Sequence, residues 1–105
     1  MAWILLIIAG LLEIVWAFTM KLSQGFTRPT ASAITLLAML ASFGLLAVSM
    51  KTLPLGTAYT IWTGIGAIGT FLAGIVALSE PASTVRIVAA VLIISGLILM
   101  KMSTP

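Results

Sequence analysis

The chain has 105 residues, of which 62% are hydrophobic and only 7% are charged. Soluble domains are about 45–50% apolar and about 25% charged, so this composition cannot build a water-facing surface, and the expected solvent is lipid. The sequence contains no cysteine and no histidine, which excludes disulfides, thiolate zinc sites, iron–sulfur ligation and histidine-dependent nucleophilic catalysis. Two acidic residues are too few for a dedicated metal cage, so we expect no enzyme, no metal and no cofactor. The net charge of +3 lies at segment ends and requires no nucleic-acid partner.

Four apolar segments follow one another and are separated by three short breaks. They extend from about residue 2 to 20, 31 to 50, 57 to 79 and 85 to 100. These lengths are close to the ~20 residues that a helix needs to cross a hydrocarbon core of ~30 Å. No basic region precedes the first segment, so we do not expect a cleaved signal peptide. The sequence therefore predicts an all-α membrane protein whose four transmembrane helices form one domain over residues 1–105.

The breaks between the segments carry turn and capping signals. The first, "KLSQGFTRPT", contains Gly25 as a helix stop and Pro29 before the next helix. The second, "KTLPLG", is a tight turn between two helices. In the third, "SEPAST", Ser83 or Thr84 is positioned to cap the last helix.

Glu13 is the only charged residue in the first segment, and it lies roughly 17 Å along the predicted helix, close to the bilayer centre. An ionised acid at that depth costs about 2.5–3.5 kcal/mol on insertion scales. Protonating an ordinary glutamate at pH 7 costs about 3.7 kcal/mol, so neither state is strongly favoured. Every lysine and arginine lies at a segment end or in a break, which leaves Glu13 without a fixed partner at mid-membrane. We expect the counter-charge to be a proton or a cation that exchanges; the alternative is a permanently protonated acid that is hydrogen-bonded between helices.

The basic residues are distributed almost evenly between the two sides of the membrane. Lys51 and Lys101 fall on the side of both termini, and Lys21, Arg28 and Arg86 fall on the other. The positive-inside rule needs a bias to choose an orientation. One interpretation is a single, weakly determined topology. The other is that the chain inserts both ways and pairs with an inverted copy of itself, which would supply the second half that many transporters use to enclose a path.

Small residues recur at helical spacing in the last two segments. They form the series Gly66, Thr70, Gly74; Gly69, Ala73, Ala77; and Ala89, Gly96. Small residues at such spacing let membrane helices approach closely, although they do not identify the partner helix.

Polar and aromatic residues are predicted to surround Glu13. Gly10 and Trp16 lie three residues on either side of it on the same helical face. Ser42 occupies a similar depth in the second segment, and the third segment contributes Tyr59 and Trp62 on one face together with Thr63 and Gly66. Hydroxyls orient a carboxylate, and aromatic faces attract cations, so we interpret this group as a cation site. The alternative is an interfacial aromatic belt, which fits Tyr59 better than the deeper tryptophans.

The stretch "GIGAIG", residues 64–69, matches the dinucleotide-binding pattern G-x-G-x-x-G. That pattern requires a preceding strand and a later acidic residue on the same unit. Here it lies inside an apolar span, so we interpret it as a locally flexible part of the third helix.

Several motifs together resemble the small multidrug resistance family. They are the helix-one glutamate, "KLSQGFTRP", "LPLGTAYTIWTGIGAIGT" and "SGLILMK", and they extend over essentially the whole chain. "GLLEIVWA" places Trp16 three residues after the glutamate, which is similar to the guanidinium exporter (SugE-like) subtype. The resemblance implies an antiparallel, dual-topology homodimer in the bacterial plasma membrane that exports guanidinium and small guanidinyl cations in exchange for protons.

The resemblance also implies roles for individual residues. Glu13 would bind substrate and proton in turn. Trp16, Ser42, Tyr59, Trp62 and Gly10 would orient it, and Met39 and Phe43 would border a side portal open to membrane lipid. Two alternatives stay open: a broader quaternary-ammonium multidrug exporter on the same scaffold, and a non-transporting membrane subunit that assists the assembly of another protein.

Overall fold

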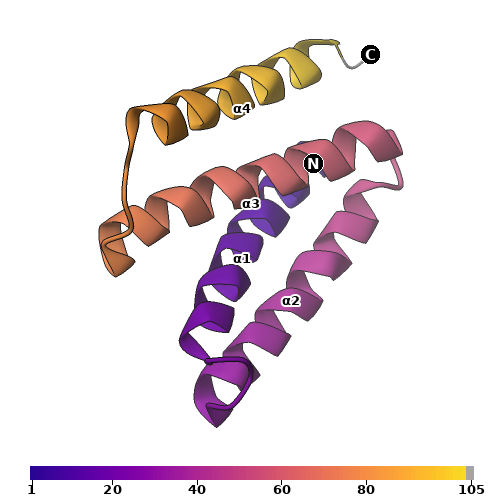
Figure 1. The fold of residues 1–105 in the computed structure, drawn as a ribbon. Helices are drawn as coiled ribbons and strands as arrows, with labels where there is room; N and C mark the ends of the chain where they lie inside the picture. Colours follow the sequence, from indigo (N-terminus) through magenta and orange to yellow (C-terminus); the bar gives the residue numbers. More distant parts are fainter. Residues whose placement is uncertain (104–105) are drawn as a thin grey trace.

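The computed structural model describes residues 1–103 as four helices joined by short connections (Figure 1). The helices are α1 (Ala2–Leu22), α2 (Pro29–Ser49), α3 (Leu55–Leu78) and α4 (Thr84–Ser103). They contain 21, 21, 24 and 20 residues, and each is long and apolar enough to cross a membrane. The predicted all-α architecture is therefore confirmed, with four helices that are long and apolar enough to cross a membrane.

Local chemistry explains where the helices begin and end. Helix α1 ends at Leu22, before the expected stop at Gly25, because residues 24–26 all have positive φ angles. Helix α2 begins at Pro29, whose missing N–H suits the first helical position. The Ser83 hydroxyl accepts a hydrogen bond from the Arg86 backbone N–H at 3.3 Å, so Ser83 caps α4.

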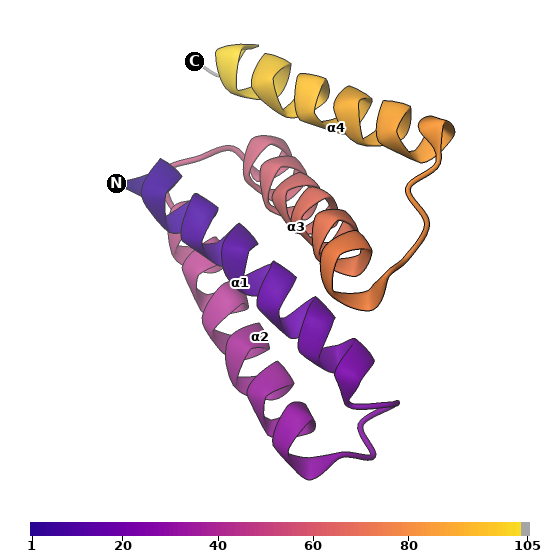
Figure 2. The ribbon, with the colours of Figure 1, turned by 90° about the vertical axis from the view of Figure 1, so that its left-hand side faces the viewer.

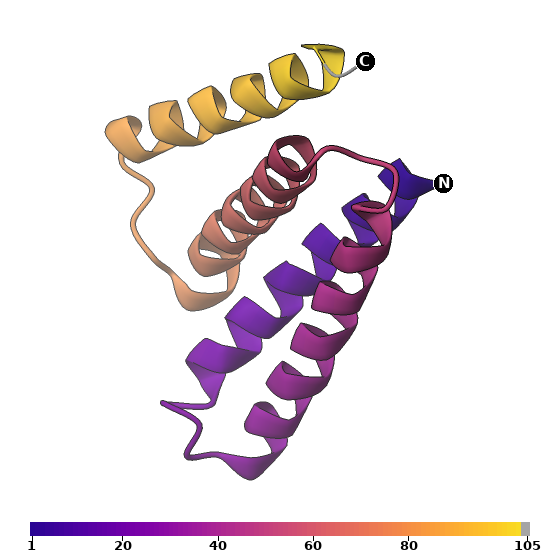
Figure 3. The ribbon, with the colours of Figure 1, turned by 90° about the vertical axis from the view of Figure 1, so that its right-hand side faces the viewer.

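The helices form a thin assembly in which α3 lies between the α1–α2 pair and α4. Helices α1 and α2 lie side by side, and α3 packs against α1 (Figure 2). Helix α4 lies on the far side of α3, and within the described residues its backbone approaches α3 alone (Figure 3). The smallest extent of the assembly is 16 Å. The α1–α2 pair, α3 and α4 thus form three layers, and α4, which approaches only α3 among the described residues, is the least covered of them.

The core lies between α1, α2 and α3. Its buried members are Leu6, Ala9, Leu46, Ala58, Ile61 and Trp62. None of the described residues of α4 is buried, although Leu97 and Met100 pack at the edge of this core. Residues 64–69 are part of the continuous helix α3, which excludes a dinucleotide-binding loop there.

Helices α1 and α3 approach closely because glycines face their partner's side chains. A Cβ atom on Gly10 would lie 2.7 Å from Cγ2 of Ile65. On α3, a Cβ atom on Gly69 would overlap the side chain of Ile14. Part of the small-residue pattern in the third segment therefore packs within one chain, against α1.

Candidate functional site

Glu13 lies near the middle of α1 and faces α3. Its side chain is half-buried, and its Oε1 atom is fully buried without a hydrogen-bond donor among the described residues. The carboxylate rests against the backbone of Gly66, where a Cβ atom would overlap it. Glycine at position 66 therefore makes the space that the carboxylate occupies. The sequence placed Gly66 near this site but did not indicate that it seats the acid.

The lysines and arginines lie at helix ends or in connections, whereas Glu13 lies near the middle of α1. Lys21 and Lys101 are in the last turns of α1 and α4, and Arg86 is in the first turn of α4. Arg28 immediately precedes α2, and Lys51 is in the connection between α2 and α3. Among the described residues, no lysine or arginine therefore lies at the level of the Glu13 carboxylate along the helices.

A hydrogen-bonded chain links the three packed helices beside the acid. Trp62 on α3 donates its indole N–H to the Ser42 hydroxyl on α2 at 3.0 Å. Ser42, which is fully buried, donates its own proton to the backbone oxygen of Ala9 on α1 at 2.7 Å. Because that oxygen belongs to the residue four positions before Glu13, the chain ties Trp62 to the helical turn that carries the acid.

Four aromatic rings contact one another across the same helices. Trp16 and Phe43 meet edge to face with their centroids 6.0 Å apart. Phe43 meets Trp62 at 5.7 Å, and Trp62 meets Tyr59 at 5.6 Å. Ring edges and faces at such separations stabilise aromatic pairs by about 0.5–1.5 kcal/mol beyond area burial. The rings thus form one connected wall that includes the two deep tryptophans.

The polar atoms of this wall are only partly used. The Trp16 indole N–H is buried and has no acceptor among the described residues. Tyr59, by contrast, is 53% exposed, so its ring extends the wall to the surface of the single chain. A buried acceptor and a buried donor without partners among the described residues, Glu13 Oε1 and Trp16 Nε1, thus lie about one helical turn apart on α1.

The structure brings most of the expected site residues together, adds ring contacts for Phe43 and places Thr63 on another side of α3. Phe43, expected only at a portal, lies between Trp16 and Trp62, although 44% of it stays exposed. Met39 lies one helical turn before it and is half-buried. Thr63, which was grouped with Trp62, instead lines a cavity toward α4, because residues 62 and 63 point to different sides of α3.

The comparisons with known proteins agree in family and extent. The family description "Small Multidrug Resistance protein" matches residues 1–93. The chain belongs to the small multidrug resistance family. Among its relatives in this family is the guanidinium exporter of Yersinia pestis, which is 58% identical over 99% of this chain and 100% of its own length. The guanidinium exporter of Escherichia coli strain K12 is 54% identical, and that of Citrobacter freundii is 53% identical, each over 99% of both chains.

These small multidrug resistance relatives are named as exporters, so the comparisons place the chain among membrane transporters rather than enzymes. The resemblance expected from the motifs is therefore confirmed at the level of the family. The four apolar helices agree with a multi-pass membrane protein.

Proposed function

We propose that the protein exports guanidinium and small guanidinyl cations across the bacterial plasma membrane in exchange for protons. The observation that carries this proposal is the buried Oε1 of Glu13, which has no hydrogen-bond partner among the described residues and lies on α1 about one turn from Trp16 of the aromatic wall. Full-length relatives named as guanidinium exporters support the choice of substrate.

The geometry of guanidinium matches this arrangement. The ion is planar and permanently charged, and it donates two parallel N–H bonds to a carboxylate. Aromatic faces within about 6 Å of a cation add electrostatic attraction. A planar ion bound edge-on to Glu13 would place its faces toward the rings that line the region, among them Trp16 and Trp62.

Exchange follows when proton and substrate compete for one carboxylate. Guanidinium binds the ionised form of Glu13, and protonation removes the charge that holds it, so occupancy by one excludes the other. Alternating access of the site to the two sides then couples export of the cation to entry of the proton. The hydrogen bonds from Trp62 to Ser42 and from Ser42 to Ala9 hold the turn of α1 that carries Glu13 in place against α2 and α3 during this exchange.

The complete transporter in this proposal is an antiparallel homodimer. The single chain leaves Glu13 half-exposed, and none of the described residues of α4 is buried. A second copy could therefore bury the Glu13 side chain and cover the exposed surface of α4. The nearly even distribution of lysine and arginine supports insertion in both orientations. Because the chain has no cysteine, single Ala2→Cys and Ser103→Cys variants can be labelled with an impermeant maleimide. Labelling of each from both membrane faces is expected, and labelling from one face only would contradict dual topology.

The proposal is tested by proton movement in proteoliposomes under an imposed guanidinium gradient. Wild type should couple the two fluxes, and Glu13→Gln should fall to the level of empty vesicles because its amide cannot exchange a proton. Glu80→Gln is the matched control, since Glu80 is the other acid of the chain and lies in the connection between α3 and α4. We expect this control to retain wild-type flux.

A bulky aromatic quaternary ammonium provides the comparison substrate. Trp16 and Phe43 narrow the region beside Glu13, so this cation should drive much less proton flux than guanidinium. The reverse preference would favour a multidrug exporter. Absence of flux with either cation from folded wild-type protein would favour a non-transporting subunit.

A further inference from the structure

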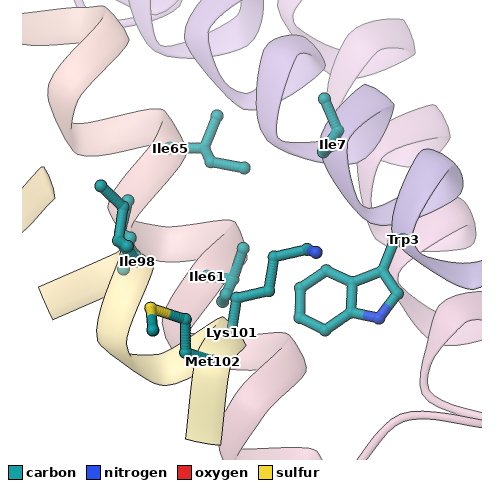
Figure 4. A pocket seen from close by; sticks show the side chains of 8 residues that line it. Trp3, Ile7, Ile61, Ile65, Ile98, Lys101 and Met102 are labelled. Carbon is teal, nitrogen blue, oxygen red and sulfur yellow. The ribbon is translucent and has the colours of Figure 1, made fainter. Parts of the chain in front are cut away.

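An apolar groove separate from the Glu13 region opens between the start of α1, the first half of α3 and the end of α4. It has a volume of about 330 Å³. Its walls include Ile7, Ile61, Ile65, Leu97 and Ile98, with Trp3 and Lys101 at one end (Figure 4). No acidic side chain lines it among the described residues. The groove therefore has an apolar body and a cationic end.

Trp3 and Lys101 build that cationic end. The Lys101 side chain extends from α4 toward the Trp3 indole on α1, and its Nζ atom lies 5.1 Å from the ring centroid (Figure 4). Trp3 is in the first turn of α1 and Lys101 in the last turn of α4, so both lie at the same edge of the membrane. Tryptophan prefers the headgroup level, and lysine extends its ammonium there while its stem stays in apolar surroundings.

A similar construction occurs at the other end of the α3–α4 contact. The Arg86 guanidinium carbon lies 5.2 Å from the centroid of the Phe71 ring. Both side chains line a smaller cavity of about 250 Å³ with Ala67, Ala90 and Ile93. The contact between α3 and α4 thus carries a cation over an aromatic ring near each surface of the membrane, with apolar space beside it.

We propose that the groove at Lys101 binds an anionic phospholipid, with one acyl chain along the isoleucines and the phosphate on the Lys101 ammonium. An acyl chain fits an apolar cavity that opens to the bilayer, and a basic group between membrane helices at headgroup level attracts an anionic headgroup. The substrate cation does not fit, because Lys101 repels it and the groove offers no carboxylate. A soluble phosphate would use only the ammonium and would leave the apolar walls without a ligand.

The test is photo-crosslinking of the purified full-length protein in phosphatidylcholine vesicles. The probe is a phosphatidylglycerol with a diazirine in one acyl chain, and the matched probe has a phosphatidylcholine headgroup. We expect the anionic probe to label the peptides that contain Ile61, Ile65 and Ile98. Lys101→Gln should lower this labelling about fivefold, the effect of one basic residue at an anionic lipid surface. Lys51→Gln, on the same membrane side but outside the groove, should leave it unchanged.

A second variant tests the groove rather than the charge. Ile98→Trp fills the groove from a position that is 56% exposed, so it should abolish labelling by both probes without unfolding the protein. Equal labelling of wild type by both probes, or an unchanged signal in Lys101→Gln, would overturn the proposal. Absence of groove labelling in wild type would also overturn it and would indicate that a second copy of the chain covers this face. Photo-crosslinking does not depend on transport, so this experiment tests lipid binding independently of guanidinium export.

Discussion

Two contacts made by α3, one with the α1–α2 pair and one with α4, follow different packing rules. On the first side, glycines let α1 approach closely, and the Ser42 hydroxyl bridges helices through Trp62 and Ala9. On the second side, cavities lie between the helices, and the Ser95 hydroxyl of α4 bonds within its own helix, to Val91.

The difference teaches which interactions specify helix packing in lipid. Apolar side chains gain little by leaving lipid for another helix, so close van der Waals contact and interhelical hydrogen bonds decide which helices pair. The side of α3 that faces α1 and α2 has the close contacts with α1 and the hydrogen bonds through Ser42 of α2, whereas the apolar outer surface of α4 is left for lipid or a second copy.

Among substitutions that keep Glu13, the largest effect is expected when Gly66→Ala breaks the close approach of α3 to the acid. The added methyl group would overlap the Glu13 carboxylate, which must then move away from α3. We expect guanidinium-driven proton flux to fall at least about tenfold, as active sites are sensitive to displacements on the order of 1 Å. The measurement is guanidinium-driven proton flux, made on Gly66→Ala protein that elutes at the wild-type volume in size-exclusion chromatography and is therefore folded.

Gly96→Ala is the matched substitution in α4. Its Cβ atom would meet no heavy atom within 4 Å, so flux should stay near the wild-type level. A comparable loss in this variant would mean that another copy approaches α4 as closely as α1 approaches α3.

A smaller effect is expected when the interhelical hydrogen bonds are removed by Ser42→Ala. This change takes the acceptor from the Trp62 N–H and the donor from the Ala9 carbonyl while leaving the helix backbone intact. We expect the free energy of unfolding to fall by about 1–2 kcal/mol, since one interhelical bond in a membrane contributes about 0.6 kcal/mol and at most about 1.7. Unfolding in mixed detergent–SDS micelles, followed by circular dichroism, measures this free energy. An unchanged value would show that the two hydrogen bonds do not stabilise the packing of α1, α2 and α3.

The spans and the position of the acid could be predicted because each depends on a local property of the sequence. Helix length follows from runs of apolar residues, and the place of Glu13 near the middle of α1 follows from its distance along the first apolar run. The proximity of Ser42 and Trp62 could be predicted in the same way, because residues at similar positions along adjacent helices often contact each other.

Contacts that depend on the rotation of one helix against another could not be predicted in this way. Small residues line several faces of α3, so the sequence did not indicate that Gly66 would receive the carboxylate. The ring contacts of Phe43 and the side of α3 on which Thr63 lies could not be predicted, because their side chains are apolar or weakly polar and suit either a lipid-facing or a helix-facing position. The pairing between tryptophans and Phe43 emerges only when three helices are in place.

The smallest effect is expected from Ser95→Ala, the α4 counterpart of the Ser42 substitution. The Ser95 hydroxyl donates to the Val91 carbonyl in its own helix at 2.9 Å, and the residue is exposed. The loss of this bond is offset because alanine is the better helix former, so the free energy of unfolding should stay within about 0.5 kcal/mol of wild type. The same micelle unfolding assay measures it beside Ser42→Ala. If Ser95→Ala instead destabilised the protein as much as Ser42→Ala, its hydroxyl would have to bond to another helix, and α4 would be held by polar contacts like those between α1, α2 and α3.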